Sequence, residues 1–593
     1  MSVRTTRRRG WMTPAFVAAF ATALVLPARG ASRPLVTSDL RRIVDLEQPA
    51  IAGTGDRIAF VVVRTDFGRN AYVRELHVVD VRTGRDSLLV RGGEVTVPRW
   101  SPDGTQLAYL QERNERMALV SWNGGRPKLL ARAQGDITDF AWRPDGGAIA
   151  FSAYEAASTR DYFQAGDNDY TQTALTPAVH LWLVGAAGGS ARRLTRGTWT
   201  LTPTDSGGIF TPAFSWSGDG RRIAFARLPN TFSGDNEYST LRILDVATGA
   251  LSKPTAHPSV ELAPQFSPDG RQLLYWYAQD GNFLAQNSVR VISGGADRAA
   301  TADFDRDIGG TLWMPRSNAL LACGNDATHS RAYLVSIGGR PRTLDLGDLE
   351  ITCDAYQSST FDAGIAASVS RAGSVAFLAT DARHLRELYY AKTLSSPIRR
   401  LTHFNDFVER LSLGRIATIA WNGPGGFREY GVLTYPPNMS AGRKYPVVID
   451  IHGGPGLSEI ESLGGASYGG DWPIAQLIAA RGYIVFAPNY RGSDDAGNAF
   501  LLAIVGDTVA GPSSDIMTGL AAVKALPQAD DTRVAVCGWS YGGLLTSWLI
   551  GHDPRWKAAV SGAAVNVESQ SYDLSVSNVQ DRYYQGGVSP YVD

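Results

Sequence analysis

Short apolar runs, each introduced by a polar turn, recur along the first two thirds of the chain. A Pro-Asp-Gly turn or a close variant precedes an apolar triplet in four places: 101–104 before 107–109, 143–146 before 149–151, 217–220 before 223–225, and 267–270 before 273–275. Degenerate copies occur at 52–60, 314–322 and about 369–377. The chain therefore contains seven such units, most of them about 40–55 residues apart.

Each unit has the pattern of a small antiparallel sheet. In the turn, Pro presets φ, Asp accepts local hydrogen bonds, and Gly tolerates positive φ. The apolar triplet predicts a buried strand, and in most units a second strand follows, such as 76–81 or 241–246. One such sheet cannot bury both of its faces, whereas sheets stacked radially can. The pattern predicts a β-propeller of about seven blades; a two-sheet sandwich is the alternative, which the long regular period disfavours.

Two segments of this region interrupt the regular pattern. The polar, aromatic segment 154–170 lies in the longest gap between units. It predicts either an insertion that reaches an active-site cavity or a plain surface loop. Asp303, Asp305 and Asp307 alternate as in a calcium-binding loop, but Ile308 and Met314 replace the glycine and glutamate that such a loop needs. A solvated loop without a metal is the prediction there.

The pattern changes at about residue 415. Residues 416–421 and 430–435 predict an antiparallel strand pair. Short apolar strands then alternate with helical patterns: strands at 447–451, 483–487, 533–537 and 558–560, and helices at 472–480, 513–526 and 544–550. Such alternation predicts a parallel α/β sheet with right-handed crossovers. We expect a propeller domain at 31–405 and a second domain, an incomplete α/β-hydrolase fold, at 406–593.

The first thirty residues differ from the rest. Arg4 and Arg7 to Arg9 precede the uncharged apolar stretch 12–26, and small residues follow at 28 and 30. This arrangement predicts a secretory signal peptide at 1–30 and an exported protein, periplasmic or extracellular. An uncleaved membrane anchor is the alternative, but the stretch is short for a transmembrane helix. After cleavage we expect no stable membrane insertion.

Composition narrows the possible functions. Lys plus Arg and Asp plus Glu are both 57, so no basic excess indicates a nucleic-acid partner. The three cysteines, Cys323, Cys353 and Cys537, are too few for a disulfide scaffold and show no metal-ligand spacing. We expect free buried thiols, although export would permit a Cys323–Cys353 bridge. Neither a metal nor a cofactor is expected, and the oligomeric state cannot be inferred from the sequence.

A candidate nucleophile lies between a predicted strand and a predicted helix. Gly538-Trp539-Ser540-Tyr541-Gly542 fits G-x-S-x-G in the strand–turn–helix context of a nucleophile elbow. There the serine hydroxyl lies at the carboxyl edge of the sheet, and the glycines let strand and helix approach each other. We predict that Ser540 is the catalytic nucleophile.

A second glycine-rich segment follows the strand at 447–451. His452-Gly453-Gly454 begins a loop of the kind that contributes one backbone N–H to an oxyanion hole, while the residue after the nucleophile contributes the other. We therefore predict that Gly453 or Gly454 acts together with Tyr541. A tight structural turn is the alternative interpretation of the loop.

Together with 489–493 (Asn-Tyr-Arg-Gly-Ser), the motifs at 538–543 and 452–455 resemble those of the prolyl oligopeptidase family of serine peptidases, most closely its acylaminoacyl peptidase and dipeptidyl aminopeptidase branches. The resemblance extends from about residue 40 onward. It implies a propeller that caps an α/β-hydrolase domain, a Ser-Asp-His triad, no cofactor, and short peptides as substrates because the propeller excludes folded proteins.

The triad order of this fold is serine, acid, histidine. Beyond Ser540 the sequence contains one histidine, His552, at the end of the helix that leads away from the elbow. His452 belongs to the proposed oxyanion loop, and the remaining six histidines precede the second domain. Asp573, Asp581 and Asp593 are aspartates that follow Ser540 along the chain.

These acids precede the place where the family carries its acid and base, so we expect a C-terminally truncated version of a longer enzyme, impaired or inactive if the chain truly ends at Asp593. The hypotheses are a serine peptidase, a carboxylesterase, and a non-catalytic peptide-binding relative. Neither cleavage preference nor the dipeptidyl, acylaminoacyl or endo-acting mode can be inferred.

Overall fold

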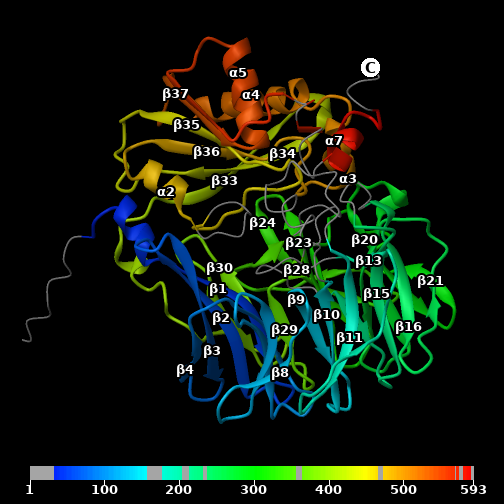
Figure 1. The fold of residues 1–593 in the computed structure, drawn as a ribbon. Helices are drawn as coiled ribbons and strands as arrows, with labels where there is room; N and C mark the ends of the chain where they lie inside the picture. Colours follow the sequence, from blue (N-terminus) through cyan, green and yellow to red (C-terminus); the bar gives the residue numbers. More distant parts are fainter. Residues whose placement is uncertain are drawn as a thin grey trace, which may run out of the picture.

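The computed structural model describes residues 32–155, 177–202, 213–231, 237–354, 364–464, 472–567, 569, 571–572 and 578–588. The predicted signal peptide and nearly all of the predicted insertion at 154–170 lie outside these residues. The described chain forms two domains, a ring of antiparallel sheets below a mixed sheet covered by helices (Figure 1).

The ring is a seven-bladed propeller, as the seven sequence units predict. Blades 1 to 3 contain β1 (Val44–Ile51), β2 (Arg57–Asp66), β3 (Ala71–Asp80) and β4 (Asp86–Arg91); β5 (Val95–Trp100), β6 (Leu107–Glu112), β7 (Met117–Trp122) and β8 (Lys128–Ala131); and β9 (Ile137–Trp142), β10 (Ala148–Tyr154), β11 (Val179–Gly185) and β12 (Arg192–Arg193). Blades 4 and 5 contain β13 (Thr200–Leu201), β14 (Phe214–Trp216), β15 (Arg222–Leu228), β16 (Thr240–Asp245) and β17 (Leu251–Ser252); and β18 (Glu261–Phe266), β19 (Gln272–Ala278), β20 (Asn287–Ser293) and β21 (Ala296–Ala299). Blades 6 and 7 contain β22 (Gly310–Trp313), β23 (Ala319–Asp326), β24 (His329–Ser336) and β25 (Arg342–Thr343); and β26 (Glu350–Ile351), β29 (Ala367–Val369), β30 (Val375–Thr380), β31 (Glu387–Ala391) and β32 (Arg399–Arg400), beside the short pair β27 (Cys353–Asp354) and β28 (Gly364–Ile365).

The repeated turns connect the first and second full strands of their blades. In the turn before β6, Gly104 has φ +74° and donates its N–H to Ser101 O at 2.8 Å, while the Ser101 hydroxyl donates to Asp103. The apolar triplets that follow these turns are buried, as predicted. The first and last blades meet through Asn405, whose amide pairs with both backbone groups of Val44.

The second domain has a six-stranded sheet in the order β33-β34-β36-β35-β37-β38. Its strands are β33 (Ile416–Asn422), β34 (Arg428–Thr434), β35 (Tyr445–Ile451), β36 (Ile484–Pro488), β37 (Ala529–Trp539) and β38 (Ala558–Gly562). Its helices are α2 (Ile474–Ala479), α3 (Asn498–Leu501), α4 (Ala510–Lys524), α5 (Tyr541–His552) and α7 (Asn578–Tyr584), and the short 3-10 helices of the whole chain are η1 (Thr37–Arg42), η3 (Gln279–Gly281), η4 (Val408–Arg410), η5 (Pro424–Gly426) and η6 (Leu502–Ile504). The first pair is antiparallel and β36, β35, β37 and β38 are parallel, which confirms the predicted change of architecture.

One face of the propeller contacts the second domain. The Ala327 N–H, between β23 and β24, donates to Asp495 O at 3.0 Å, and the Gln286 N–H, between β19 and β20, donates to Asn498 Oδ1 at 3.0 Å. Both loops connect the second and third strands of their blades. The Pro-Asp-Gly turns, which begin at the opposite ends of these strands, therefore lie on the face away from the second domain (Figure 1).

Two expectations about single residues are wrong. Cys323 and Cys353 form a disulfide rather than free thiols, because β23 and β27 bring the two residues together; Cys537 stays free and half-buried. Asp307 is 1% exposed rather than solvated, since it accepts a hydrogen bond from the Asn287 N–H beneath the second domain, whereas Asp303 and Asp305 are exposed. None of the helices within the described ranges is long and apolar enough to cross a membrane.

Candidate active site

Ser540 lies in the sharp turn between β37 and α5. Its backbone has φ +56° and ψ −120°, which is rare for a residue with a side chain and is typical of a nucleophile elbow. The Ser540 N–H donates to Gly562 O in β38 at 2.9 Å, and the Leu544 N–H donates to Ser540 O at 3.1 Å. These bonds hold the strained residue between the sheet and the helix, with its side chain half-buried.

The glycines around Ser540 allow the close approach that this turn needs. A Cβ on Gly542 would lie 2.1 Å from Ile451 O, and one on Gly538 would lie 2.3 Å from Gly542 O. A Cβ on Gly543 would lie 2.4 Å from Gly562 O. All three distances are far below van der Waals contact, so α5 can begin directly over the ends of β35 and β38 only with glycine at these positions.

The loop after β35 begins beside the elbow. Besides Ile451 O, a Cβ on Gly542 would meet His452 O at 2.7 Å, so the start of this loop touches the first turn of α5. Gly454 has φ +114°, a conformation that requires glycine. The structure therefore brings the two sequence-predicted segments together, Gly453 and Gly454 on one side and Tyr541 at the first position of α5 on the other.

His452 anchors this loop. Its Nδ1 donates to Gly453 O at 2.7 Å, its Nε2 lies 3.2 Å from the Ser493 hydroxyl, and its ring stacks on Tyr490 at 4.4 Å. The Tyr490 hydroxyl also donates to His452 O at 2.7 Å. Burial lowers the pKa of His452 to about 4, so the imidazole is neutral at ordinary pH. Through these contacts His452 holds the start of the loop after β35 in place.

The sequence reasoning missed the role of the 489–493 segment, which it used only for the resemblance. Tyr490 and Ser493 hold His452, while Arg491 forms a two-pronged ion pair with Asp515 in α4 at 2.7 and 2.8 Å. Glu429 lies beside this pair and accepts a hydrogen bond from the Trp421 indole at 2.6 Å. Burial and the neighbouring Asp515 raise the pKa of Glu429 to about 8. The 489–493 segment thus connects the loop after β35 to α4.

None of the eight histidines, all of which lie in described parts of the chain, is placed to accept the Ser540 proton. His552 ends α5, about 18 Å along the helix from Ser540, and its ring stacks on Trp548 at 3.9 Å. Six others lie in the propeller or in the link after it. Asp573 and Asp593 lie outside the described residues, and Asp581 accepts a hydrogen bond from the Ser571 hydroxyl at 3.0 Å. The described residues also contain no group of His, Cys, Asp and Glu that could hold a metal.

Comparison with known proteins agrees with this geometry. Residues 471–590 match the model of the prolyl oligopeptidase family. The chain is 27% identical to the peptidase YuxL of Bacillus subtilis over 90% of this chain and 83% of that protein. It is 24% identical to dipeptidyl-peptidase 5 of Porphyromonas gingivalis, over 88% of this chain and 78% of that protein.

Solved structures share the architecture. An acylaminoacyl peptidase in complex with Z-Gly-Gly-Phe-chloromethyl ketone matches 93% of this chain and 83% of its own with a TM-score of 0.73 at 17% identity. Uncomplexed acylaminoacyl peptidase of Pyrococcus horikoshii matches with a TM-score of 0.72 at 17% identity, over 93% of this chain and 82% of that one. Residues 471–590 therefore form a prolyl oligopeptidase family domain, and the fold of the chain is shared with these acylaminoacyl peptidase structures.

Proposed function

We propose that this protein hydrolyses short peptides through an acyl-enzyme on Ser540. The observation that carries the proposal is the strained backbone of Ser540 at the start of α5, directly beside the glycine loop after β35. In the reaction, the Ser540 oxygen attacks the scissile carbonyl, its proton passes to a base, and the amine leaves before water cleaves the ester. The N–H groups of Tyr541 and of Gly453 or Gly454 stabilise the tetrahedral oxyanion.

The position of the propeller supports a preference for short peptides. It lies directly against the domain that carries Ser540, and loops from several blades contact that domain (Figure 1). We infer that this ring hinders the approach of a folded protein to Ser540, whereas an extended peptide of a few residues is small enough to pass.

Labelling with a fluorophosphonate tests both the nucleophile and the presence of a base. The probe reacts with an activated serine hydroxyl, so label on wild-type protein would show that a base serves Ser540, and we expect Ser540→Ala to lose that label completely. Ser547→Ala is the matched control, since Ser547 lies in the same helix and its hydroxyl meets Ser561 at 2.9 Å. Label that persists in Ser540→Ala would show that the site is elsewhere.

The two other candidate functions are separated by substrate. A carboxylesterase cleaves p-nitrophenyl esters but leaves peptide amides intact, so comparing both substrates under the same conditions distinguishes it. A non-catalytic relative binds peptides in a titration but is never labelled. Either result would overturn the peptidase proposal, whereas cleavage of a short peptide that depends on Ser540 supports it.

We also propose that the protein is exported. The charged and apolar pattern of residues 1–30 supports this, and so does the Cys323–Cys353 disulfide, because such bonds persist in oxidising compartments. The expected outcome in a fractionated bacterial host is mature protein outside the cytoplasm that begins near residue 31. N-terminal sequencing of the purified protein measures this directly.

A further inference from the structure

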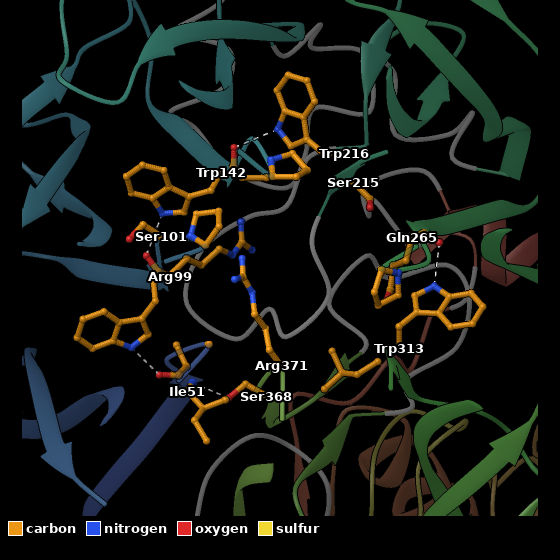
Figure 2. Close-up of a pocket in the computed structure, with 18 of the residues that line it drawn as sticks. Ile51, Arg99, Ser101, Trp142, Ser215, Trp216, Gln265, Trp313, Ser368 and Arg371 are labelled. Carbon is orange, nitrogen blue, oxygen red and sulfur yellow. Dashed lines mark hydrogen bonds between the residues drawn. The ribbon is translucent and has the colours of Figure 1, made fainter. Parts of the chain in front are cut away.

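A cavity of about 620 Å³ lies at the centre of the propeller, on the face away from Ser540. Its wall is formed where the innermost strands end and the Pro-Asp-Gly turns begin, at positions such as Trp100, Trp142 and Trp216 (Figure 2). These turns lie on the face opposite the loops that contact the second domain. The cavity is therefore separate from the candidate active site, and its size falls in the range of small-ligand sites.

A repeated bulge shapes the wall of this cavity. Gln48, Val97 and Ala263 have φ of about +50°, each precedes a proline, and the strand register shifts at each of these positions. Proline is tolerated there because the innermost strands are sheet edges with no inner neighbour. Bulges of this kind redirect the side chains that follow them. Arg99 and Gln265, two residues after the bulged positions, both line the cavity.

The charge of the cavity has one sign. Among the described residues that line it, Arg99 and Arg371 are the charged ones, and neither Asp nor Glu lines it. Their side chains extend from blades 2 and 7 toward the same central point (Figure 2). Arg99 also pairs at 2.6 Å with Asp139, a buried carboxylate that accepts hydrogen bonds from the N–H groups of Phe140 and Ala213 as well. Arg371 is exposed to the cavity solvent, so its charge remains available to a ligand.

A third donor is present in the wall. Gln48 is 7% exposed, and its Oε1 accepts from the Thr96 hydroxyl at 2.9 Å and from the Val97 N–H at 2.6 Å. These two bonds fix which end of the amide is the oxygen. The Gln48 Nε2 is buried and has no hydrogen-bond partner within the described ranges. A buried donor without a partner is costly, which favours a ligand that accepts a hydrogen bond.

We propose that this cavity binds a carboxylate, held by the guanidinium groups of Arg371 and Arg99 and by the Gln48 amide. Guanidinium presents paired N–H donors that match the two oxygens of a carboxylate. The surrounding indole and proline rings accommodate an apolar stem beside such a pair. The carboxylate belongs either to a free small acid or to an acidic side chain of a short peptide, and the same chemistry recognises both.

Titration with two probes tests the site and separates these sources. Glutarate represents the free acid, and acetyl-Glu-Ala-amide carries its only carboxylate on a side chain. Two or three charge-assisted hydrogen bonds lead us to expect saturable binding of at least one probe with a Kd of about 1 mM or tighter. Because four tryptophans line the cavity, binding should also change the tryptophan emission of the full chain.

The decisive variant is Arg371→Gln. We expect its Kd for the bound probe to rise about tenfold or more, with an unchanged melting temperature because Arg371 is exposed. Arg126→Gln is the matched control, an exposed arginine of the propeller outside the cavity, and it should bind like wild type. Arg99→Gln leaves the buried Asp139 without its ion pair and can therefore destabilise the fold. Its Kd is interpreted only together with its melting temperature.

Binding of glutarate alone assigns the site to small acids, and binding of the peptide alone assigns it to acidic peptides. The proposal is wrong if neither probe binds, or if Arg371→Gln binds as tightly as wild type. Ser540→Ala should bind the probes unchanged, so this result is independent of the proposed peptidase activity.

Discussion

At the scale of single residues, the geometry of the candidate active site depends more on the close approach of backbone segments than on side-chain chemistry. Gly538, Gly542 and Gly543 each face a carbonyl oxygen that a Cβ would overlap. The G-x-S-x-G spacing predicted this elbow from the sequence, because the motif directly follows an apolar strand. The burial of His452 and its bond to Ser493 had no sequence signal, since both depend on the path of the 489–493 segment.

Gly542→Ala tests the close approach at α5. We expect a loss of about 1–3 kcal/mol in the free energy of unfolding, because the new Cβ would lie 2.1 Å from Ile451 O and force the helix away from β35. Chemical denaturation measures the loss, and fluorophosphonate labelling should fall with it.

Gly551→Ala is the matched control for this change. It lies in the same helix and a Cβ there meets no atom within 4 Å, so alanine should stabilise the helix by up to about 1 kcal/mol. Equal effects of the two substitutions would contradict the role given to the close contact.

At the scale of elements, the innermost strands of the propeller are tied to one another by tryptophan. The indole N–H of Trp100 donates to Ala50 O, that of Trp142 to Arg99 O, and that of Trp216 to Ala141 O, each at 3.0–3.2 Å. Each bond runs from one blade to the preceding blade. The turn repeat predicted the blades themselves, but these bonds depend on the stacking of neighbouring sheets, which a single unit does not specify.

Trp142→Phe tests this tie between blades 2 and 3. The substitution keeps an aromatic ring but leaves Arg99 O without its indole donor. We therefore expect the free energy of unfolding to fall by about 1–3 kcal/mol, as measured by thermal or chemical denaturation. Trp122→Phe is the control, because Trp122 lies at the end of β7 and outside the cavity. It should lower the free energy of unfolding less than Trp142→Phe does. A larger loss for Trp122→Phe would show that ring size rather than the hydrogen bond matters.

At the scale of the whole molecule, three buried carboxyl groups lie where the domains meet. Asp307 belongs to the propeller, and Asp494 and Asp495 belong to the second domain; Asp494 accepts hydrogen bonds from Asn325 at 3.0 and 3.1 Å. Burial raises the pKa of Asp307 and Asp495 to about 7 and that of Asp494 to about 6. The charge of Asp494 raises the pKa of the other two further, whereas Arg306 lowers that of Asp495.

These shifts predict how stability depends on pH. In the unfolded chain an aspartate releases its proton near pH 3.9, whereas folded Asp495 holds it to about pH 7. Between these values the folded state binds more protons, so the contribution of Asp495 to stability falls as pH rises from about 4 to about 7. Asp495→Asn cannot titrate and should therefore raise the melting temperature relative to wild type more at pH 8 than at pH 5.

Thermal melts of both proteins across this range measure the difference. Asp303→Asn, which removes an exposed carboxylate of the propeller, is the control for the loss of a charge and should change the melting temperature little. A gain for Asp495→Asn that is equal at all pH values would contradict the raised pKa.

The sequence by itself determined the features that depend on neighbouring residues. Turn chemistry and apolar spacing specify the blades, the change to alternating strands and helices marks the second domain, and the Ser540 elbow follows from its motif, because local φ and ψ preferences and burial on one face act over a few residues. Only the tertiary structure decided the Cys323–Cys353 bond, the burial of Asp307 beneath the second domain, and the convergence of Arg99 and Arg371. Each of these joins segments from different blades or domains, and closure of the ring and docking of the second domain decide which segments meet.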